Sequence, residues 1–234
     1  MEIKTFKTKE EASQAAFQEF QALVDEGGGV FGLATGSTPI LLYDLLTQAD
    51  SIDFSNSESI NLDEYRGLAA DHPQSYSYFM HQHLFNKKPF RHSYLLDGTN
   101  SNAEEETSHF EEIIQAHPID LQLLGLGMNG HIGFNEPGSS FDSRTRVVDL
   151  TASTIDANKR FFASEEDVPR QAYSMGIGSI LSAKKIVLMA FGENKADAVY
   201  KMVHGPKTEE VPASALQSHD DVVVLLDEGA ASLL

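Results

Sequence analysis

One histidine and one glutamate lie in the most glycine-rich segment of the chain, LGLGMNGHIGFNEPG at residues 124–138, which also holds five glycines. Glu136 follows His131 by five residues, close enough along the chain to orient its imidazole ring. A carboxylate hydrogen-bonded to one ring nitrogen fixes the tautomer and leaves the other nitrogen for proton transfer. The glycines allow the backbone a tight path around the ring. The segment therefore predicts an acid–base site.

Two adjacent carboxylates, Asp63 and Glu64, follow the strand-like residues 59–62. A carboxyl group at a strand end, shielded by neighbouring aromatic groups, can have a raised pKa and act as a general base. The pair alone is more typical of a carboxylate that caps the following turn. The two interpretations stay open at this point.

The segment ATGSTP at residues 34–39 follows an apolar run and precedes a helical pattern. Gly36 lets the backbone approach a ligand closely, and the hydroxyl and N–H groups around Ser37 and Thr38 can bind an anion. We expect Thr38 to cap the helix and Pro39 to occupy its first position. Such a segment is more often a plain loop-to-helix junction than a phosphate site.

Apolar runs alternate with helical patterns along the chain. Near-continuous apolar runs predict strands that are buried on both faces, at residues 29–34, 59–62, 119–124, 185–190 and 222–226. Apolar residues at helical spacing predict helices at residues 9–24, 39–46, 75–85, 103–116 and 195–203. This alternation indicates a single α/β domain over residues 1–234 with a mainly parallel sheet. Ligands of such sheets bind beyond the carboxyl ends of the strands, where all three segments above are expected to lie.

Composition excludes several classes of partner. Seventeen Lys and Arg against 35 Asp and Glu give a formal charge of −18, which repels nucleic acid and anionic membranes. There is no cysteine, so thiol catalysis is excluded. The chain has neither the apolar core of a signal peptide near its start nor an apolar run of the roughly 20 residues that span a bilayer. We expect a soluble cytoplasmic protein.

The glycine-rich segment resembles the signature of the glucosamine-6-phosphate deaminases and isomerases. Three further motifs of that family follow its order along the chain: ATGSTP at 34–39, NLDEY at 61–65 and GENKA at 192–196. The resemblance implies a Rossmann-like sheet with helices on both faces and an enzyme of amino-sugar catabolism. Its reaction would convert glucosamine 6-phosphate into fructose 6-phosphate and ammonia, with no metal and no organic cofactor.

The resemblance also implies roles for individual residues. Asp63 would move a proton from C2 toward C1 of the sugar, and His131 would open the ring with support from Glu136 and Asn129. The substrate phosphate would bind at Gly36, Ser37, Thr38, Arg160 and Lys195. Residues 151–175 would form a mobile lid that carries Arg160 inward.

Two departures from the family pattern concern charge and regulation. Asn129 stands where many members have Asp, so polarisation of the histidine must depend on a hydrogen bond and on Glu136. Val148 and Asp149 replace a Lys-Thr pair that helps some members to bind N-acetylglucosamine 6-phosphate between subunits, and an acidic Asp149 would repel that activator. The chain also lacks the longer tail of the regulated hexamers. We therefore expect a non-allosteric enzyme that is a monomer or a weak homo-oligomer.

Three alternative functions are weaker. A 6-phosphogluconolactonase shares the glycine-rich loop, but the residues after His131 and the 63–65 segment resemble the deaminases. A sugar-phosphate sensor of a transcription regulator would carry a basic DNA-binding segment, which the acidic chain does not have. A metal enzyme is disfavoured because His81 and His83, two apart on an expected helix, cannot share a metal ion.

Overall fold

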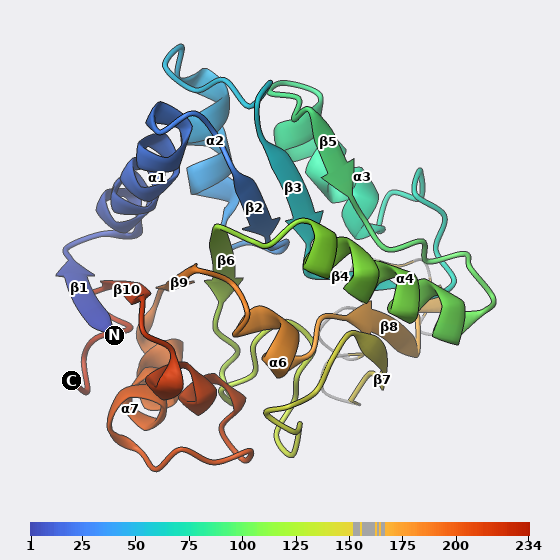
Figure 1. Ribbon diagram of the computed structural model, residues 1–234. Helices are drawn as coiled ribbons and strands as arrows, with labels where there is room; N and C mark the ends of the chain where they lie inside the picture. Colours follow the sequence, from blue (N-terminus) through green and yellow to red (C-terminus); the bar gives the residue numbers. More distant parts are fainter. Residues whose placement is uncertain (152–154, 156–161, 163, 165–166) are drawn as a thin grey trace.

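The computed structural model describes residues 1–151, 155, 162, 164 and 167–234. Within them, a seven-stranded parallel sheet has the order β1-β10-β9-β6-β2-β3-β5 (Figure 1). Its strands are β1 (Glu2–Phe6), β2 (Val30–Leu33), β3 (Glu58–Asn61), β5 (His92–Tyr94), β6 (Leu121–Gly125), β9 (Lys185–Ala190) and β10 (Val222–Asp227). The predicted parallel α/β fold is confirmed, and all carboxyl ends of the sheet share one edge.

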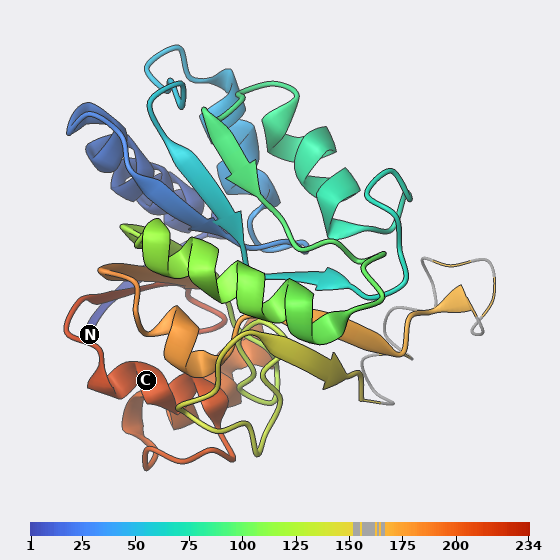
Figure 2. The same cartoon turned by 45° about the vertical axis from the view of Figure 1, so that its right-hand side comes forward.

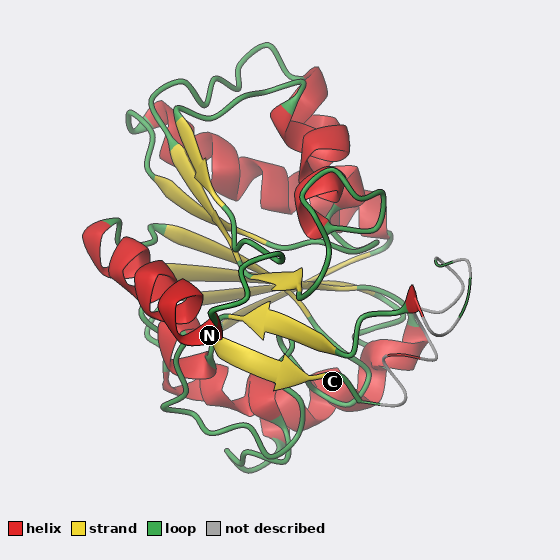
Figure 3. Ribbon diagram, turned by 90° about the vertical axis from the view of Figure 1, so that its right-hand side faces the viewer, coloured by secondary structure: helices red, strands yellow, loops and turns green. Residues whose placement is uncertain are grey.

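Helices cover both faces of the sheet. The helix α4 lies across one face, while α1 and α2 pack together on the other (Figures 2 and 3). None of the helices in the described ranges is long and apolar enough to cross a membrane. The α-helices are α1 (Lys9–Asp25), α2 (Ile40–Gln48), α3 (Tyr76–Met80), α4 (Ala103–Ala116), α6 (Ile177–Ile180) and α7 (Ala196–His204). A π-helical turn, His81–Phe85, continues α3, and 3₁₀ turns span Glu193–Lys195 and Pro212–Ser218.

A second, antiparallel sheet of order β4-β8-β7 lies beside the carboxyl edge of the first. Its strands are β4 (Asp63–Tyr65), β7 (Arg146–Asp149) and β8 (Gln171–Ser174). Asp63 is paired with Ser174, more than one hundred residues away. The strand β8 falls inside the segment that the sequence predicts as a lid, and most of the remaining lid residues lie outside the described ranges. The lid stays a prediction.

The core forms because the strands of the large sheet are apolar on both faces. Phe31 of β2 stacks on Phe20 of α1, with ring centroids 5.0 Å apart, and contacts Phe54 edge-on at 5.3 Å. All three side chains are fully buried, and each contributes about 1.5–3 kcal/mol by leaving water. On the other side of β2, Gly32 leaves room for the buried side chain of Gln122 from β6, which a Cβ would overlap. The interior of the sheet, which leads to its carboxyl edge, is thus tightly packed.

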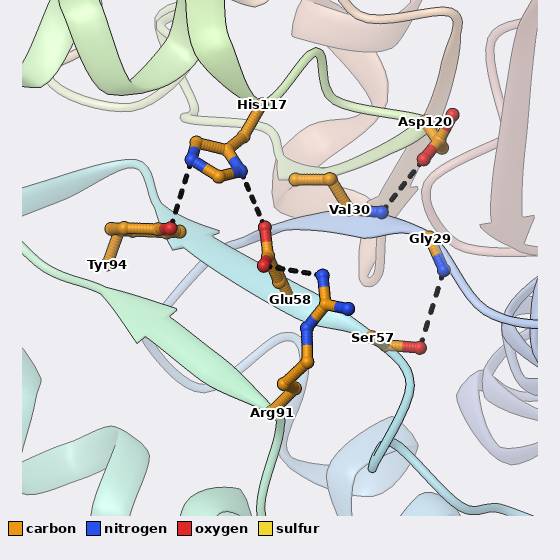
Figure 4. A network of polar contacts seen from close by, with 8 residues as sticks. All are labelled: Gly29, Val30, Ser57, Glu58, Arg91, Tyr94, His117 and Asp120. Carbon is orange, nitrogen blue, oxygen red and sulfur yellow. Dashed lines mark hydrogen bonds and ion pairs between the residues drawn. The ribbon is translucent and has the colours of Figure 1, made fainter.

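Polar contacts join the elements at the opposite, amino-terminal edge (Figure 4). Glu58, the first residue of β3, accepts a hydrogen bond from Arg91 Nη2 at 2.6 Å and pairs with His117 Nδ1 at 2.7 Å. The other nitrogen of His117 lies 3.1 Å from the Tyr94 hydroxyl. Burial would raise the pKa of Glu58, but Arg91 and His117 together hold it below its usual value. This network, defined here as the Glu58 cluster, ties β3 to β5 and to the end of α4.

We predict that Glu58→Gln lowers the free energy of unfolding by about 1–2 kcal/mol at pH 7. A carboxyl group with a lowered folded-state pKa stabilises the protein above its unfolded pKa, and this contribution is lost as pH falls through the folded value. The difference between wild type and variant should therefore shrink below about pH 4. Urea denaturation at pH 7 and pH 3.5 measures it, with exposed Glu210→Gln as control. An equal difference at both pH values would contradict the assignment.

Candidate active site

A pocket of about 560 Å³ opens at the carboxyl edge of the sheet. The residues that line it lie at the ends of four neighbouring strands, β9, β6, β2 and β3, or in the segments after them, except Tyr76 of α3. The chain passes from β2 to β3 on one side and later returns to β6 on the other, so the pocket lies where the strand order reverses. Its size is typical of a site for a small molecule. The lining residues are Ala34, Thr35, Gly36, Thr38, Leu62, Asp63, Tyr76, Gly125, Leu126, Gly127, Met128, Asn129, His131, Gly133, Phe134, Glu136 and Lys195.

Asp63 lies at the inner wall of this pocket and is 8% exposed. Its carboxylate lies beside Gly133, with Oδ2 3.7 Å from the position that a Cβ there would occupy. Burial, and then the neighbouring charge of Glu64, raises the pKa of Asp63 to about 8. A carboxyl group with this pKa is a far stronger base than an ordinary aspartate and can exchange protons near neutral pH.

The glycine-rich loop after β6 wraps closely around His131. Gly127 N donates to His131 O at 2.9 Å, and a Cβ at Gly127 would overlap the imidazole ring. Gly130 follows with a φ of 85°, a conformation that side-chain-bearing residues avoid. The sequence-based expectation of a tight path is therefore met, and the contact at Gly127 gives its physical reason.

A chain of hydrogen bonds joins Glu136, Asn129 and His131. The Asn129 amide nitrogen donates to Glu136 Oε2 at 2.6 Å, so its oxygen is turned toward His131 Nδ1, 2.7 Å away. An amide oxygen only accepts, and therefore the proton of a neutral imidazole lies on Nδ1. Glu136 Oε1 also lies 3.5 Å from the same nitrogen. The arrangement leaves Nε2 of His131 as a proton acceptor.

The loop after β2 differs in detail from the sequence-based expectation. Thr35, Gly36 and Thr38 line the pocket, but Ser37 is exposed and is not part of the lining. The helix α2 begins at Ile40, with Pro39 in the capping position and no side-chain capping bond. The predicted Thr38 cap is therefore wrong, and the Thr38 side chain is turned toward the pocket instead, near Gly125.

Lys195 brings a cation to the pocket from the turn after β9. Both carboxylate oxygens of Asp227 accept a hydrogen bond from Gly192 N at 2.9 Å, which fixes the start of this turn. Burial lowers the pKa of Lys195, and no ion pair holds its ammonium group among the described residues. Arg160, the second cation predicted for a phosphate, lies outside the described residues. Lys195 is thus available to an anionic ligand.

The lining residues without a predicted role include Tyr76, Phe134 and Met128. Tyr76 stacks on Phe134 with ring centroids 6.0 Å apart and planes 6° apart. Phe134 and Met128 belong to the glycine-rich segment, and its close resemblance to the family signature could have identified them as pocket residues. Tyr76 lies only in an expected helix, and no local signal places its ring beside Asp63.

In the part of the chain that is described, no group of three or more His, Asp or Glu side chains could hold a metal ion. The pocket instead combines a buried carboxyl group, an oriented imidazole and a lysine. This set can transfer protons to and from a bound anion.

Comparison with known proteins gives this geometry a context. Residues 7–225 match the family described as glucosamine-6-phosphate isomerases/6-phosphogluconolactonase. The chain belongs to this family. A glucosamine-6-phosphate deaminase of Lacticaseibacillus paracasei is 60% identical over all of this chain and 99% of its own length. The corresponding enzyme of Ligilactobacillus salivarius is 56% identical over the full length of both chains.

Solved structures of the family separate into two degrees of similarity. A monomeric glucosamine-6-phosphate deaminase superposes with a TM-score of 0.95 at 42% identity, and the match covers 100% of both chains. A 6-phosphogluconolactonase from Leishmania guyanensis has a TM-score of 0.79 at 22% identity over 98% of this chain and 97% of its own. The second similarity shows the shared fold of the family and nothing finer.

The raised pKa of Asp63 predicts an unusual dependence of stability on pH. Between about pH 4, where this carboxyl ionises in the unfolded chain, and about pH 8, the folded state binds more protons. Stability from this group therefore falls as pH rises across that interval. Because Asn stays neutral, Asp63→Asn should be more stable than wild type at pH 9, by at least about 1 kcal/mol more than it is at pH 5.

Urea denaturation at the two pH values measures this difference. The exposed Asp50→Asn is the matched control and should show no such change with pH. Parallel stability curves for wild type and Asp63→Asn would mean that the Asp63 carboxyl titrates as an ordinary aspartate.

Proposed function

We propose that the protein is a glucosamine-6-phosphate deaminase, which converts glucosamine 6-phosphate and water into fructose 6-phosphate and ammonia. One observation carries this proposal. A buried base, Asp63, faces the same pocket as His131, whose imidazole ring is oriented by Glu136 through the Asn129 amide. The identities of 60% and 56% to deaminases over the whole chain support the same reaction.

The proposed role of Asp63 is to take the proton from C2 of the open-chain sugar and deliver it to C1. Such a carbon acid is weak, and an ordinary aspartate would be a poor base for it. The buried carboxylate gains basicity because its charged form is poorly solvated. The same group, once protonated, is the acid that returns the proton to C1, so a single residue serves both half-steps.

The proposed role of His131 is to open the pyranose ring. Its Nε2 would take the proton from the C1 hydroxyl and pass a proton to the ring oxygen. Asn129 contributes the hydrogen bond that fixes the Nδ1–H tautomer. Glu136, which is hydrogen-bonded to Asn129, provides the negative charge. The imidazolium formed in this step is thus stabilised although position 129 is itself neutral.

The phosphate is assigned to the loop after β2 and to Lys195. Gly36 and Thr38 line the pocket and offer N–H and hydroxyl donors, and Lys195 offers positive charge. Ser37 lies between them outside the lining and is proposed as a further donor on the basis of the family motif. Arg160 is proposed as a further cation on the basis of the family motif alone. In a protein with a net charge of −18, a local cation is needed to attract an anionic substrate.

Once the proton has moved to C1, the amino group leaves C2 as ammonia and water supplies the ketone oxygen.

The first test is to incubate purified protein with glucosamine 6-phosphate and to measure ammonia and fructose 6-phosphate together. We expect equal amounts of both products and a loss of at least about 100-fold in kcat for Asp63→Asn. Asp50→Asn is the control and should keep full activity. Lys195→Met should raise KM more than it lowers kcat, because it removes charge from the phosphate and not from the reacting carbons.

A protein that formed neither product but hydrolysed 6-phosphogluconolactone would belong to the other branch of the family. A lactonase needs no base at C2, and its activity should then survive in Asp63→Asn. This outcome would overturn the proposed reaction.

We also propose that the enzyme acts as a monomer without allosteric activation. The monomeric deaminase with a TM-score of 0.95 supports this state. Exposed Asp149 accepts a hydrogen bond from Gln171 Nε2 at 2.8 Å and presents negative charge where an activator phosphate would need a cation. Light scattering should give the mass of one chain, and rate curves should be hyperbolic with or without N-acetylglucosamine 6-phosphate. A sigmoidal curve that the acetylated sugar makes hyperbolic would contradict the proposal.

A further inference from the structure

Glu64, the neighbour of Asp63 on β4, is buried outside the pocket lining and is 2% exposed. Its carboxylate accepts three backbone hydrogen bonds, each 2.8 Å long. Tyr65 N and Tyr76 N donate to Oε1, and Ser77 N donates to Oε2. Three N–H donors favour the charged form of a carboxylate and so oppose the effect of burial. Burying a charged group costs free energy unless hydrogen bonds compensate it. The buried position of Glu64 beside the pocket therefore indicates a specific role for its carboxylate.

Two of the three hydrogen bonds, from Tyr76 N and Ser77 N, join two walls of the pocket. Asp63 belongs to β4, whereas Tyr76 and Ser77 are the first two residues of α3. The ring of Tyr76 lines the pocket, packs on Phe134 and lies 4.8 Å from the ring of Tyr65. The side chain of Glu64 therefore fixes the position of the Tyr76 ring relative to the Asp63 carboxylate, and this ring shields Asp63 from water.

The two carboxyl groups on β4 have opposite surroundings. Glu64 has three N–H donors, whereas no hydrogen bond to the Asp63 carboxylate is found among the described residues. Burial raises the pKa of both groups, but the donors oppose this effect at Glu64. Glu64 therefore loses its proton first, and the second proton must leave Asp63 next to an existing negative charge.

The other groups around Asp63 do not supply this charge. Burial keeps Tyr43, Tyr65 and Tyr76 neutral in the pH range in question. The strand β8, which pairs with β4, adds only Tyr173 as a titratable group. His131 and Lys195 line the same pocket and carry positive charge when protonated, which would favour ionisation of Asp63. Glu136 also lines the pocket, where it accepts a hydrogen bond from Asn129. Of the described carboxylates, Glu64 is the neighbour whose charge raises the pKa of Asp63.

We propose that Glu64 is a positioning residue whose fixed negative charge makes Asp63 a stronger base and whose hydrogen bonds hold Tyr76 over the same pocket. This role rests on the proposed function of Asp63 in proton transfer. It explains why two carboxylates stand side by side at the end of β3: one faces the substrate, and the other is bound to backbone N–H groups and tunes the first.

The test compares Glu64→Gln and Glu64→Asp by the pH dependence of kcat/KM. Gln has the size of Glu but no charge, so the rise of kcat/KM with pH should move to lower pH by at least about half a unit. Its plateau should also fall by at least about threefold, because the base is weaker. Asp keeps the charge and loses reach, so its pH profile should stay near that of wild type while its stability falls.

Glu106→Gln is the matched control. Glu106 is a buried carboxylate that accepts a hydrogen bond from Asp97 N at 2.8 Å and another from Asn100 Nδ2 at 2.9 Å. Its neutral variant should lose stability without any shift of the pH profile. A Glu64→Gln enzyme that likewise loses stability but keeps the wild-type profile would overturn the proposal, because a purely structural role predicts that result.

A second measurement needs neither a variant nor catalysis. In wild-type protein with ¹³C-labelled Asp carboxyl groups, the resonance of Asp63, assigned by its absence in Asp63→Asn, should titrate in two steps. The smaller step should come at the lower pH at which Glu64 ionises. A single step would overturn the proposal. Because this readout requires no turnover, a protein without deaminase activity but with the two-step titration would invalidate the proposed function and leave the charge coupling intact.

Discussion

Parallel alignment of β9, β6, β2 and β3 is the constraint on which the rest of the structure depends. Strands that run parallel end at the same edge, so the four segments that follow them converge although they are far apart in the sequence. The apolar side chains on both faces of the sheet hold this alignment, and the helices α1, α2 and α4 shield them from water. Apart from Tyr76 of α3, the residues that line the pocket lie at the ends of these strands or in the segments that directly follow them.

Three carboxylates in and beside the pocket differ in the groups that surround them. Asp63 is buried with no hydrogen-bond donor among the described residues, Glu64 is buried with three donors, and Glu136 interacts with the histidine through an intervening amide. The surroundings thus assign three carboxylates of the same chemical type to different tasks. Asn129 fits this scheme because it transmits the orienting effect of Glu136 without adding a charge or a titratable proton of its own.

The large sheet and the acid–base segments could be predicted from the sequence because their signals are local. The runs at 185–190 and 222–226 are apolar enough to identify β9 and β10 directly. The strands β1 and β5 could not be predicted in the same way, since β1 mixes charged with apolar residues at an exposed edge and β5 has three residues. The second sheet pairs Asp63 with Ser174, and no local pattern encodes a contact of that range. For the same reason, the site of Tyr76 depends on hydrogen bonds from α3 to Glu64 and was not predictable from its own neighbours.

The Glu58 cluster and the pocket occupy opposite edges of one sheet, at the amino and the carboxyl ends of the same strands. Among the described residues, the Glu58 cluster and the pocket thus consist of separate sets of side chains, connected through β3. For an engineer, this separation means that heat tolerance can be selected at residues such as Arg91 and His117 while the pocket is left untouched. For evolution, it means that the fold can drift at one edge while the chemistry at the other is conserved.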